Sequence, residues 1–454
     1  MEPVCAEIVN FAGKQGGAGV CVEGPQVGRG KWICGMCRWG GSPEDLGFRF
    51  VHIADVHLES PFRGRDAAMR RKLRDAVCEA FSRAVQLAID GHADAFLIAG
   101  DLFDSERLSF SAERYLMEAL RRLQAARITV CYARGNHDAA GSTMSQPLAW
   151  PSNVEQFDSD TPRTVDIYRD GMLVGKVTGI GHVSPVESRN LVARFPAVAD
   201  ADVPHVGLVH AQVVGAEGAE AHQRYAPAAL TDFQGRGYAY WALGHVHQRQ
   251  QVLDNPDVWY PGNLQGRHPN ETGPKGALWV EVSRPSAVQV RFVPLAPIVW
   301  ERWEHVCDPR TQNLESLVQA IVAEHAAAEA AGERMVRLHL RGPTPLFAAL
   351  RNEDNQNVLA ELLQERLGLA YVEIDTTEVR RPIDLAAYSS RGGLLEIIER
   401  LSDAADADEA VLQQLAPDVL AGLPVGADPN DYLRALLKEA AADLLERLIP
   451  EDRP

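Results

Sequence analysis

Five short apolar stretches, each ending in small residues and then Asp, Asn or His, constrain the fold of this chain more than any other feature. The clearest is residues 95–99, an apolar run followed at once by Gly100 and Asp101. Helical patterns separate several of these runs, and that alternation is typical of an α/β domain. Ligand-binding groups in open α/β sheets collect at the carboxyl ends of strands. We therefore expect the five polar clusters to converge on one site.

Hydrophobic periodicity places the elements of this α/β domain. A repeat of four residues along one face predicts a helix over 67–89, and a second amphipathic helix follows around 115–123. Residues 165–180 resemble a hairpin that turns at Asp170-Gly171. The predicted strands are 48–54, 95–99, 128–132, 206–209, 238–243 and 277–282, with an edge strand at 288–293.

At 454 residues the chain is too long for one ordinary domain. We expect a glycine-rich flexible leader over 1–46 and the α/β domain over 47–295. An α/β accessory, or capping, domain follows over 296–390, with helices at 314–331 and 358–367 and strands at 335–340 and 369–374. Residues 391–454 are expected to form a helical, acidic C-terminal region.

Composition limits the functional classes. The formal charge of −17 argues against a protein that holds nucleic acid by overall electrostatics, although metal ions can supply positive charge locally. Seven mostly scattered cysteines indicate a reducing compartment, and no apolar run is long enough for a membrane span, so we expect a cytoplasmic protein. Cys34 and Cys37 could be half of a zinc or redox site, but without a well-spaced second pair we expect them to be incidental.

The strand-end clusters offer a mixed set of nitrogen and oxygen ligands. Such a set suits manganese, iron or zinc better than calcium, and it is large enough for two ions. Residues i and i+2 face the same side of a strand, so Asp55 with His57, and His245 with His247, can share one site if the backbone stays extended there. The complete set is Asp55, His57, Asp101, Asn136, His137, His210, His245 and His247.

Each residue taken alone has a simpler explanation. His57 or His210 could be a hydrogen-bonded core histidine, Asp101 could cap a helix, and Asn136 could belong to a turn. In this order and spacing, however, the set favours a dinuclear metal site. Asp101 follows a buried strand, and its two carboxylate oxygens would allow it to bridge two ions.

These blocks resemble the signature of the calcineurin-like metallophosphoesterases. Within that superfamily the chain is similar to the SbcD-type DNA repair exonucleases, and most of all to their YhaO-like branch. The resemblance covers about residues 48–294. It rests on Asp55-Val56-His57, Gly100-Asp101-Leu102-Phe103-Asp104, Gly135-Asn136-His137-Asp138, His210 and Gly244-His245-Val246-His247, with support from residues 52–62 and 260–268.

The resemblance implies a four-layer sandwich, in which two mixed β-sheets are flanked by helices, and two divalent ions, with manganese expected. One ion falls on Asp55, His57, Asp101 and His247, and the other falls on Asp101, Asn136, His210 and His245. His137 is then the expected general acid for the departing oxygen. Either Asp138 or Asp104 would orient it, and the sequence leaves that choice open.

Two further points concern substrate and partners. SbcD-type nucleases usually carry a histidine where this chain has Asp104, at a position associated with nucleic acid near the cut. The chain also lacks the Gly-x-x-x-x-Gly-Lys-Ser/Thr motif of P-loop ATPases. The resemblance therefore implies a separate coiled-coil, SbcC-like ATPase as partner, and a homodimer is a further possibility.

Basic residues near the clusters are candidates for substrate contact. Arg267 and His268 could bind phosphate, although a pair between Arg267 and Glu271 explains the arginine equally well. Arg63, Arg65 and the basic residues of 70–74 could form a rim that steers an anionic strand, or simply a solvated helix face.

The function that we expect is metal-dependent phosphodiester hydrolysis on DNA, as the exonuclease subunit of a repair complex. One alternative is hydrolysis of a small phosphodiester or phosphomonoester by the same site. Another is a non-catalytic adaptor that docks an ATPase.

Overall fold

The computed structural model describes residues 47–104, 108–140, 148–198, 203–219, 223–284, 287–326 and 332–382, together with Leu433. The leader predicted over 1–46, with Cys34 and Cys37, lies outside these residues. Apart from Leu433, so does the helical region predicted over 391–454.

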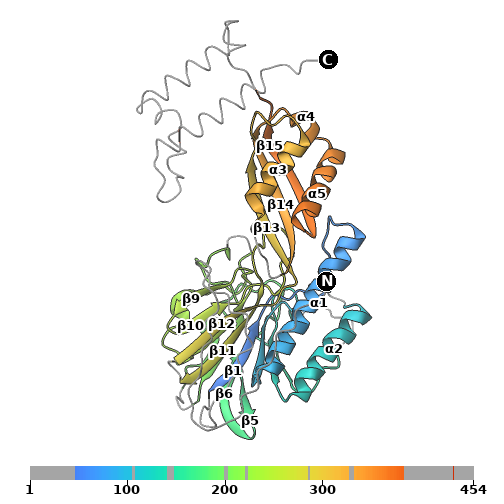
Figure 1. Cartoon of the computed structure of the whole chain (residues 1–454). Helices are drawn as coiled ribbons and strands as arrows, with labels where there is room; N and C mark the ends of the chain where they lie inside the picture. The colour runs from blue at the N-terminus through green and yellow to red at the C-terminus, as the bar shows by residue number, and fades with distance from the viewer. Residues whose placement is uncertain are drawn as a thin grey trace, which may run out of the picture. The chain divides into compact units, whose positions relative to one another are not determined.

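The first sheet contains the three strands whose ends carry Asp55, Asp101 and Asn136. Its order is β12-β11-β1-β2-β3-β4, and Figure 1 shows β12, β11 and β1 side by side. Strands β1 to β4 are parallel, so the carboxyl ends of β1, β2 and β3 lie at one edge. The strands are β1 (Phe48–Ile53), β2 (Ala95–Ala99), β3 (Thr129–Ala133), β4 (Val154–Phe157), β11 (Gly276–Arg284) and β12 (Ala287–Pro294).

Two helices cover one face of this sheet (Figure 1). Helix α1 (Ala67–Asp90) begins where the Asp66 side chain accepts from the Met69 amide, and α2 (Phe110–Ala125) begins at Ser109 in the same way. Their buried faces pack on the strands in one apolar cluster that includes Phe81, Phe96 and Leu120. Helix packing thus fixes the strands whose ends carry the candidate ligands.

The second sheet has the order β5-β6-β7-β8-β10-β9. The predicted hairpin is confirmed, since β5 and β6 are joined by Asp170 and Gly171, both with positive φ, as a tight hairpin turn requires. Strands β6, β7 and β8 are parallel, which brings His210 and Gly244 to one edge. The strands are β5 (Arg163–Arg169), β6 (Met172–Gly179), β7 (His205–His210), β8 (Tyr240–Gly244), β9 (Gln250–Asp254) and β10 (Asp257–Tyr260).

The two sheets pack face to face. Phe50 and Leu97 from the first sheet share an apolar cluster with Val206 and Tyr240 from the second. The other face of the second sheet is covered by irregular segments, which contribute Val192 of the 3-10 turn Val192–Arg194 and Phe233, the residue after the 3-10 turn Leu230–Asp232. The fold is the α/β sandwich of two mixed sheets that the sequence predicts.

A third, smaller sheet follows in the chain. Its strands β13 (Ile298–Val306), β14 (Glu333–Pro343) and β15 (Tyr371–Arg380) are all parallel. Helix α3 (Leu314–His325) connects the first two, whereas α4 (Phe347–Leu350) and α5 (Glu353–Leu367) lie between the second and third. These helices pack on the strands around their own apolar cluster, as repeated βαβ units do.

The elements that the periodicity did not predict include β4, β9, β10 and β13. Each of the first three is four or five residues long and has partly exposed positions. In β13 buried positions alternate with partly or fully exposed ones, and several of the exposed positions carry charged residues. Such short or polar strands are defined by their neighbours rather than by their own pattern. No helix in the described ranges combines the length and the apolarity that crossing a bilayer requires.

Candidate metal centre

The five strand ends meet where the carboxyl edges of the two sheets come together. Asp55 and His57 follow β1, and Asp101 follows β2. The backbone joins these ends, because the amide of Asp55 donates to the carbonyl of Gly100 at 3.1 Å and that of His57 donates to Asp101 at 3.0 Å. His245 donates its own amide to both carboxylate oxygens of Asp55, at 3.2 and 3.0 Å, which ties the second sheet to the first.

The condition that the backbone stays extended at Asp55 and His57 is not met. Both have left-handed φ values, 51° and 53°, and Asp101 has 51° and His245 has 109°. Non-glycine residues adopt such conformations at a cost of about 1–3 kcal/mol each, and they cluster at functional sites. The side chains still reach one site, but a tight left-handed turn brings them there rather than strand alternation.

Two glycines allow the strand ends to approach closely. A Cβ at Gly135 would stand 2.2 Å from a carboxylate oxygen of Asp101, and one at Gly244 would stand 1.8 Å from the carbonyl oxygen of Ala99. These positions therefore exclude any side chain.

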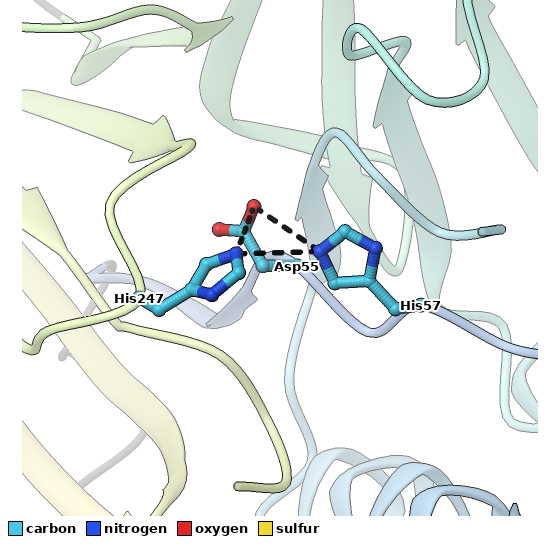
Figure 2. A group of neighbouring side chains, drawn as sticks. All are labelled: Asp55, His57 and His247. Atoms are coloured by element: carbon cyan, nitrogen blue, oxygen red, sulfur yellow. Dashed lines mark hydrogen bonds and ion pairs between the residues drawn. The ribbon is translucent and has the colours of Figure 1, made fainter. Parts of the chain in front are cut away.

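One group of ligand atoms comes from Asp55, His57 and His247 (Figure 2). His57 Nε2 lies 3.3 Å from His247 Nε2 and 4.0 Å from Asp55 Oδ1, while His247 Nε2 lies 3.7 Å from the same oxygen. His57 Nε2 is also 3.9 Å from Asp101 Oδ2. These are the four residues that the resemblance assigns to one ion.

A second group contains Asp55, Asp101 and His210. His210 Nε2 lies 3.5 Å from Asp101 Oδ2 and 3.0 Å from Asn136 Oδ1. His245 is beside them, with its ring centroid 5.2 Å from that of His210, and its Nε2 donates to the carbonyl of Gln223 at 3.0 Å. In the neutral imidazole of His245 the lone pair is then on Nδ1.

The donor set fits divalent cations. His210 donates from Nδ1 to the carbonyl of Ala99 at 2.9 Å, and His247 donates from Nδ1 to Glu271 Oε1 at 2.7 Å. Each neutral imidazole therefore turns the lone pair of Nε2 toward the carboxylates, an arrangement typical of metal-binding histidines. Buried acceptors that face one another in this way need a positive charge between them.

Burial explains the electrostatics of the same residues. It raises the pKa of Asp55 to about 7 and that of Asp101 well above its ordinary value, and it lowers the pKa of His57 and of His210. Neutral histidines and buried carboxyl groups suit a bound cation. The positive charge of the cation would stabilise the ionised form of the carboxyl groups.

Asp104, rather than Asp138, contacts His137. Asp104 Oδ1 lies 2.7 Å from His137 Nδ1, and this hydrogen bond raises the pKa of His137 to about 9. Burial would raise the pKa of Asp104, but the hydrogen bonds from His137, His57 and Ser60 lower it. Ser60 Oγ donates to Asp104 Oδ2 at 2.6 Å.

Asp138 uses its carboxylate to shape the loops beneath the site. It accepts from the amides of Leu102 and Gly135 and from the hydroxyl of Tyr132, each at 2.6 Å. It thus holds the strand ends that carry Asp101 and Asn136.

The two basic candidates lie beside the candidate metal-binding residues. The Arg267 guanidinium is 3.6 Å from Asp104 Oδ2 and 3.4 Å from Glu271 Oε1, so the predicted pair with Glu271 is present. His268 is half exposed, 3.4 Å from the same glutamate.

Sequence reasoning missed the role of Glu271 in holding His247. Glu271 also accepts from the side-chain amide of Asn263 at 2.8 Å and from the amide of Arg267 at 2.7 Å. Burial acts to raise its pKa, but the hydrogen bond from His247 and the positive charges of Arg267, His247 and His268 lower it well below the ordinary value. Its only signal in the sequence was its place shortly after the block that begins at Tyr260.

Comparisons with known proteins agree with this arrangement. The family model for calcineurin-like phosphoesterases matches residues 48–249. The chain is 31% identical over 322 residues to the uncharacterized metallophosphoesterase YhaO of Bacillus subtilis, and the alignment covers 70% of this chain and 77% of YhaO. It is 28% identical over 249 residues to the DNA double-strand break repair protein Mre11 of Aeropyrum pernix, covering 52% of this chain and 58% of Mre11.

A solved structure, a dimetal phosphatase from Danio rerio, is similar with 13% identity and a TM-score of 0.34, over 54% of this chain and 99% of that one. The family assignment rests instead on the family model and on the similarity to YhaO. The chain therefore belongs to the calcineurin-like metallophosphoesterases, a family of phosphoesterase hydrolases that use divalent metal ions.

Proposed function

We propose that this chain hydrolyses phosphodiester bonds in DNA. The observation that carries the proposal is a groove of about 1020 Å³ at the candidate metal centre. Its lining includes four of the proposed metal-binding residues and the general-acid candidate, together with basic side chains: Asp101, Asn136, His245, His247, His137, Arg267 and His268. That volume exceeds what a single phosphate ester needs. The similarity to Mre11, whose name states a role in DNA double-strand break repair, supports DNA as the polymer.

The residues assigned by the resemblance would hold two divalent ions. Asp55, His57, Asp101 and His247 would hold one, and Asp101, Asn136, His210 and His245 would hold the other, with manganese as our first choice. When bound, two such ions supply the positive charge that favours attack at the phosphorus atom.

His137 is suited to protonate the leaving oxygen. Its side chain is 43% exposed, so it can meet a substrate, and its Nε2 lies 4.0 Å from Asp101 Oδ2. Asp104 holds Nδ1 and thereby orients the ring, leaving Nε2–H directed at the site. Arg267 is positioned to bind a phosphate oxygen of the same substrate.

The exonuclease mode and the partners are further parts of the proposal. The similarity to Mre11 favours a repair complex, and a separate coiled-coil ATPase and a homodimer stay predictions from the sequence. A cytoplasmic location is likewise a prediction.

The test is a manganese-dependent assay on single-stranded and double-stranded DNA and on bis(p-nitrophenyl) phosphate. Wild type is compared with Asp101→Asn and His137→Gln, and Arg310→Gln serves as control because Arg310 is 90% exposed and paired only with Asp308 in the described residues. We expect wild type and the control to cleave DNA and both site variants to lose that activity.

Other outcomes separate the alternatives. Turnover of the small diester without any DNA cleavage would show that the chain is a phosphoesterase for small substrates. Inactivity of wild type on all substrates, with its fold intact by circular dichroism, would favour the adaptor.

A further inference from the structure

The groove continues beyond the metal-binding residues toward two cations that the sequence analysis did not single out. Arg249 follows β8, and Lys275 immediately precedes β11; both line the same groove as Asp101 and His137. Lys275 Nζ donates to the carbonyl of His247 at 2.8 Å. Its ammonium group is therefore anchored next to a residue expected to bind metal.

These two cations differ from Arg267 in the carboxylates that lie beside them. Arg267 lies between the carboxylates of Asp104 and Glu271. Among the described residues, no carboxylate oxygen comes within 4.0 Å of the side-chain nitrogens of Arg249 or Lys275. The guanidinium of Arg249 instead lies 3.8 Å from the centroid of the Phe292 ring, which holds it in place.

The two cations line one groove, and their positive charges act on each other. Burial lowers the pKa of Lys275; Glu271 opposes that change, and the positive charge of Arg249 adds to it. Two neighbouring cations at the wall of a groove, with no carboxylate of their own, favour an anionic ligand.

We propose that Arg249 and Lys275 form a second phosphate site, which binds the phosphate adjacent to the cleaved one in a nucleic-acid strand. This inference rests on the proposed function. It limits the preferred substrate to a strand with at least two consecutive phosphates, so that mononucleotides and simple diesters are poorer substrates.

An aromatic ring in the same groove agrees with a strand as ligand. Tyr225 lines the groove and packs edge-on against His245, with ring centroids 5.8 Å apart. Proteins that bind single strands combine a positively charged groove with aromatic side chains on which bases stack.

The test compares two short substrates that differ by one phosphate. The dinucleotide TpT contains a single phosphodiester, whereas TpTpT places a second phosphate next to the first. We expect wild type to cleave TpTpT with a kcat/KM about tenfold higher than TpT, the size of one charge-assisted hydrogen bond. Arg249→Gln and Lys275→Gln should each reduce this ratio toward two, the value that the two phosphodiester bonds of TpTpT give without a second site, and Arg249→Lys should restore part of it.

A binding measurement provides a readout that does not depend on turnover. The affinity for fluorescein-labelled dT8 is measured by anisotropy in EDTA at several salt concentrations. Each glutamine variant should weaken binding and lower the slope of log K against log salt by about 0.7, the value for one phosphate contact on a single strand. Arg310→Gln should retain the wild-type slope.

The outcomes distinguish this inference from the proposed function. If wild type cleaves neither TpT, TpTpT nor longer DNA but turns over bis(p-nitrophenyl) phosphate, the proposed function fails. If wild type cleaves DNA while both glutamine variants keep the wild-type substrate ratio and salt slope, only the second phosphate site is overturned.

Discussion

The carboxylate of Asp104 lies 2.7 Å from Nδ1 of His137 and also accepts a hydrogen bond from Ser60. Asp104 is the position at which this chain departs from the histidine usual in SbcD-type nucleases. In the structure its carboxylate holds the ring of the proposed general acid, His137.

A general acid should matter most for a poor leaving group. We predict that His137→Gln lowers kcat on DNA by roughly 100-fold or more, as loss of acid catalysis does. The loss on bis(p-nitrophenyl) phosphate should be much smaller, because p-nitrophenolate leaves without a proton. Steady-state kinetics on both substrates measures the difference.

The matched control for this prediction is His339→Gln, which changes a histidine of β14 that pairs with Asp375 and Glu378. It should leave both activities unchanged. Equal losses on the two substrates in His137→Gln would argue against a role in protonating the leaving group.

Glu271 should stabilise bound metal through His247. We predict that Glu271→Gln weakens manganese binding by about 10- to 100-fold, because the carboxylate no longer fixes the imidazole. Isothermal titration calorimetry measures the affinity directly. Glu315→Gln, at an exposed position of α3, should bind as wild type does, and an unchanged affinity in Glu271→Gln would refute the role.

The glycine before His245 should tolerate no side chain. We predict that Gly244→Ala abolishes manganese binding or moves the strand end, since its Cβ would overlap the carbonyl oxygen of Ala99. Calorimetry and thermal unfolding report the two effects. Gly171→Ala is the comparison, because a Cβ there meets open space although φ is positive; it should affect stability alone. Wild-type manganese affinity in Gly244→Ala would contradict the close approach.

A buried ion pair far from the site links the two sheets. Asp94 precedes β2, and its carboxylate accepts from the Arg169 guanidinium at the end of β5 and from the amide of Arg49 at 2.8 Å. We predict that Asp94→Ala lowers the free energy of unfolding by about 3 kcal/mol, because Arg169 loses this partner in a partly buried place. Urea denaturation measures the change, with Asp166→Ala on the exposed side of β5 as control. A decrease in the free energy of unfolding that is smaller than the decrease in Asp166→Ala would contradict this link.

Much of the fold could be predicted from the sequence because the central strands are apolar on both faces. All residues of β2 are buried, and the four-residue repeat of α1 reflects its packing on the sheet. The peripheral strand β9 has exposed positions and no such pattern, so its place depends on its pairing with β10.

In the candidate site, too, some features follow from the local sequence pattern and others depend on neighbouring elements. The ligand residues were visible because each follows an apolar strand, and the structure brings them together. Their backbone conformation was not visible, because the left-handed φ of Asp55 and His57 is imposed by hydrogen bonds to the neighbouring strand end. Lys275, and the role of Glu271 beyond its pair with Arg267, were missed for a related reason, since their importance comes from contacts with His247 that no local pattern records.

The most direct test of the central claim is anomalous diffraction from crystals of the full chain soaked in manganese. The strand ends should hold two adjacent ions, roughly 3.5–4 Å apart, with Asp101 between them. One peak should lie beside His57 and His247, and the other beside Asn136 and His210. No peak at Asp101, or a single peak elsewhere, would contradict the dinuclear site.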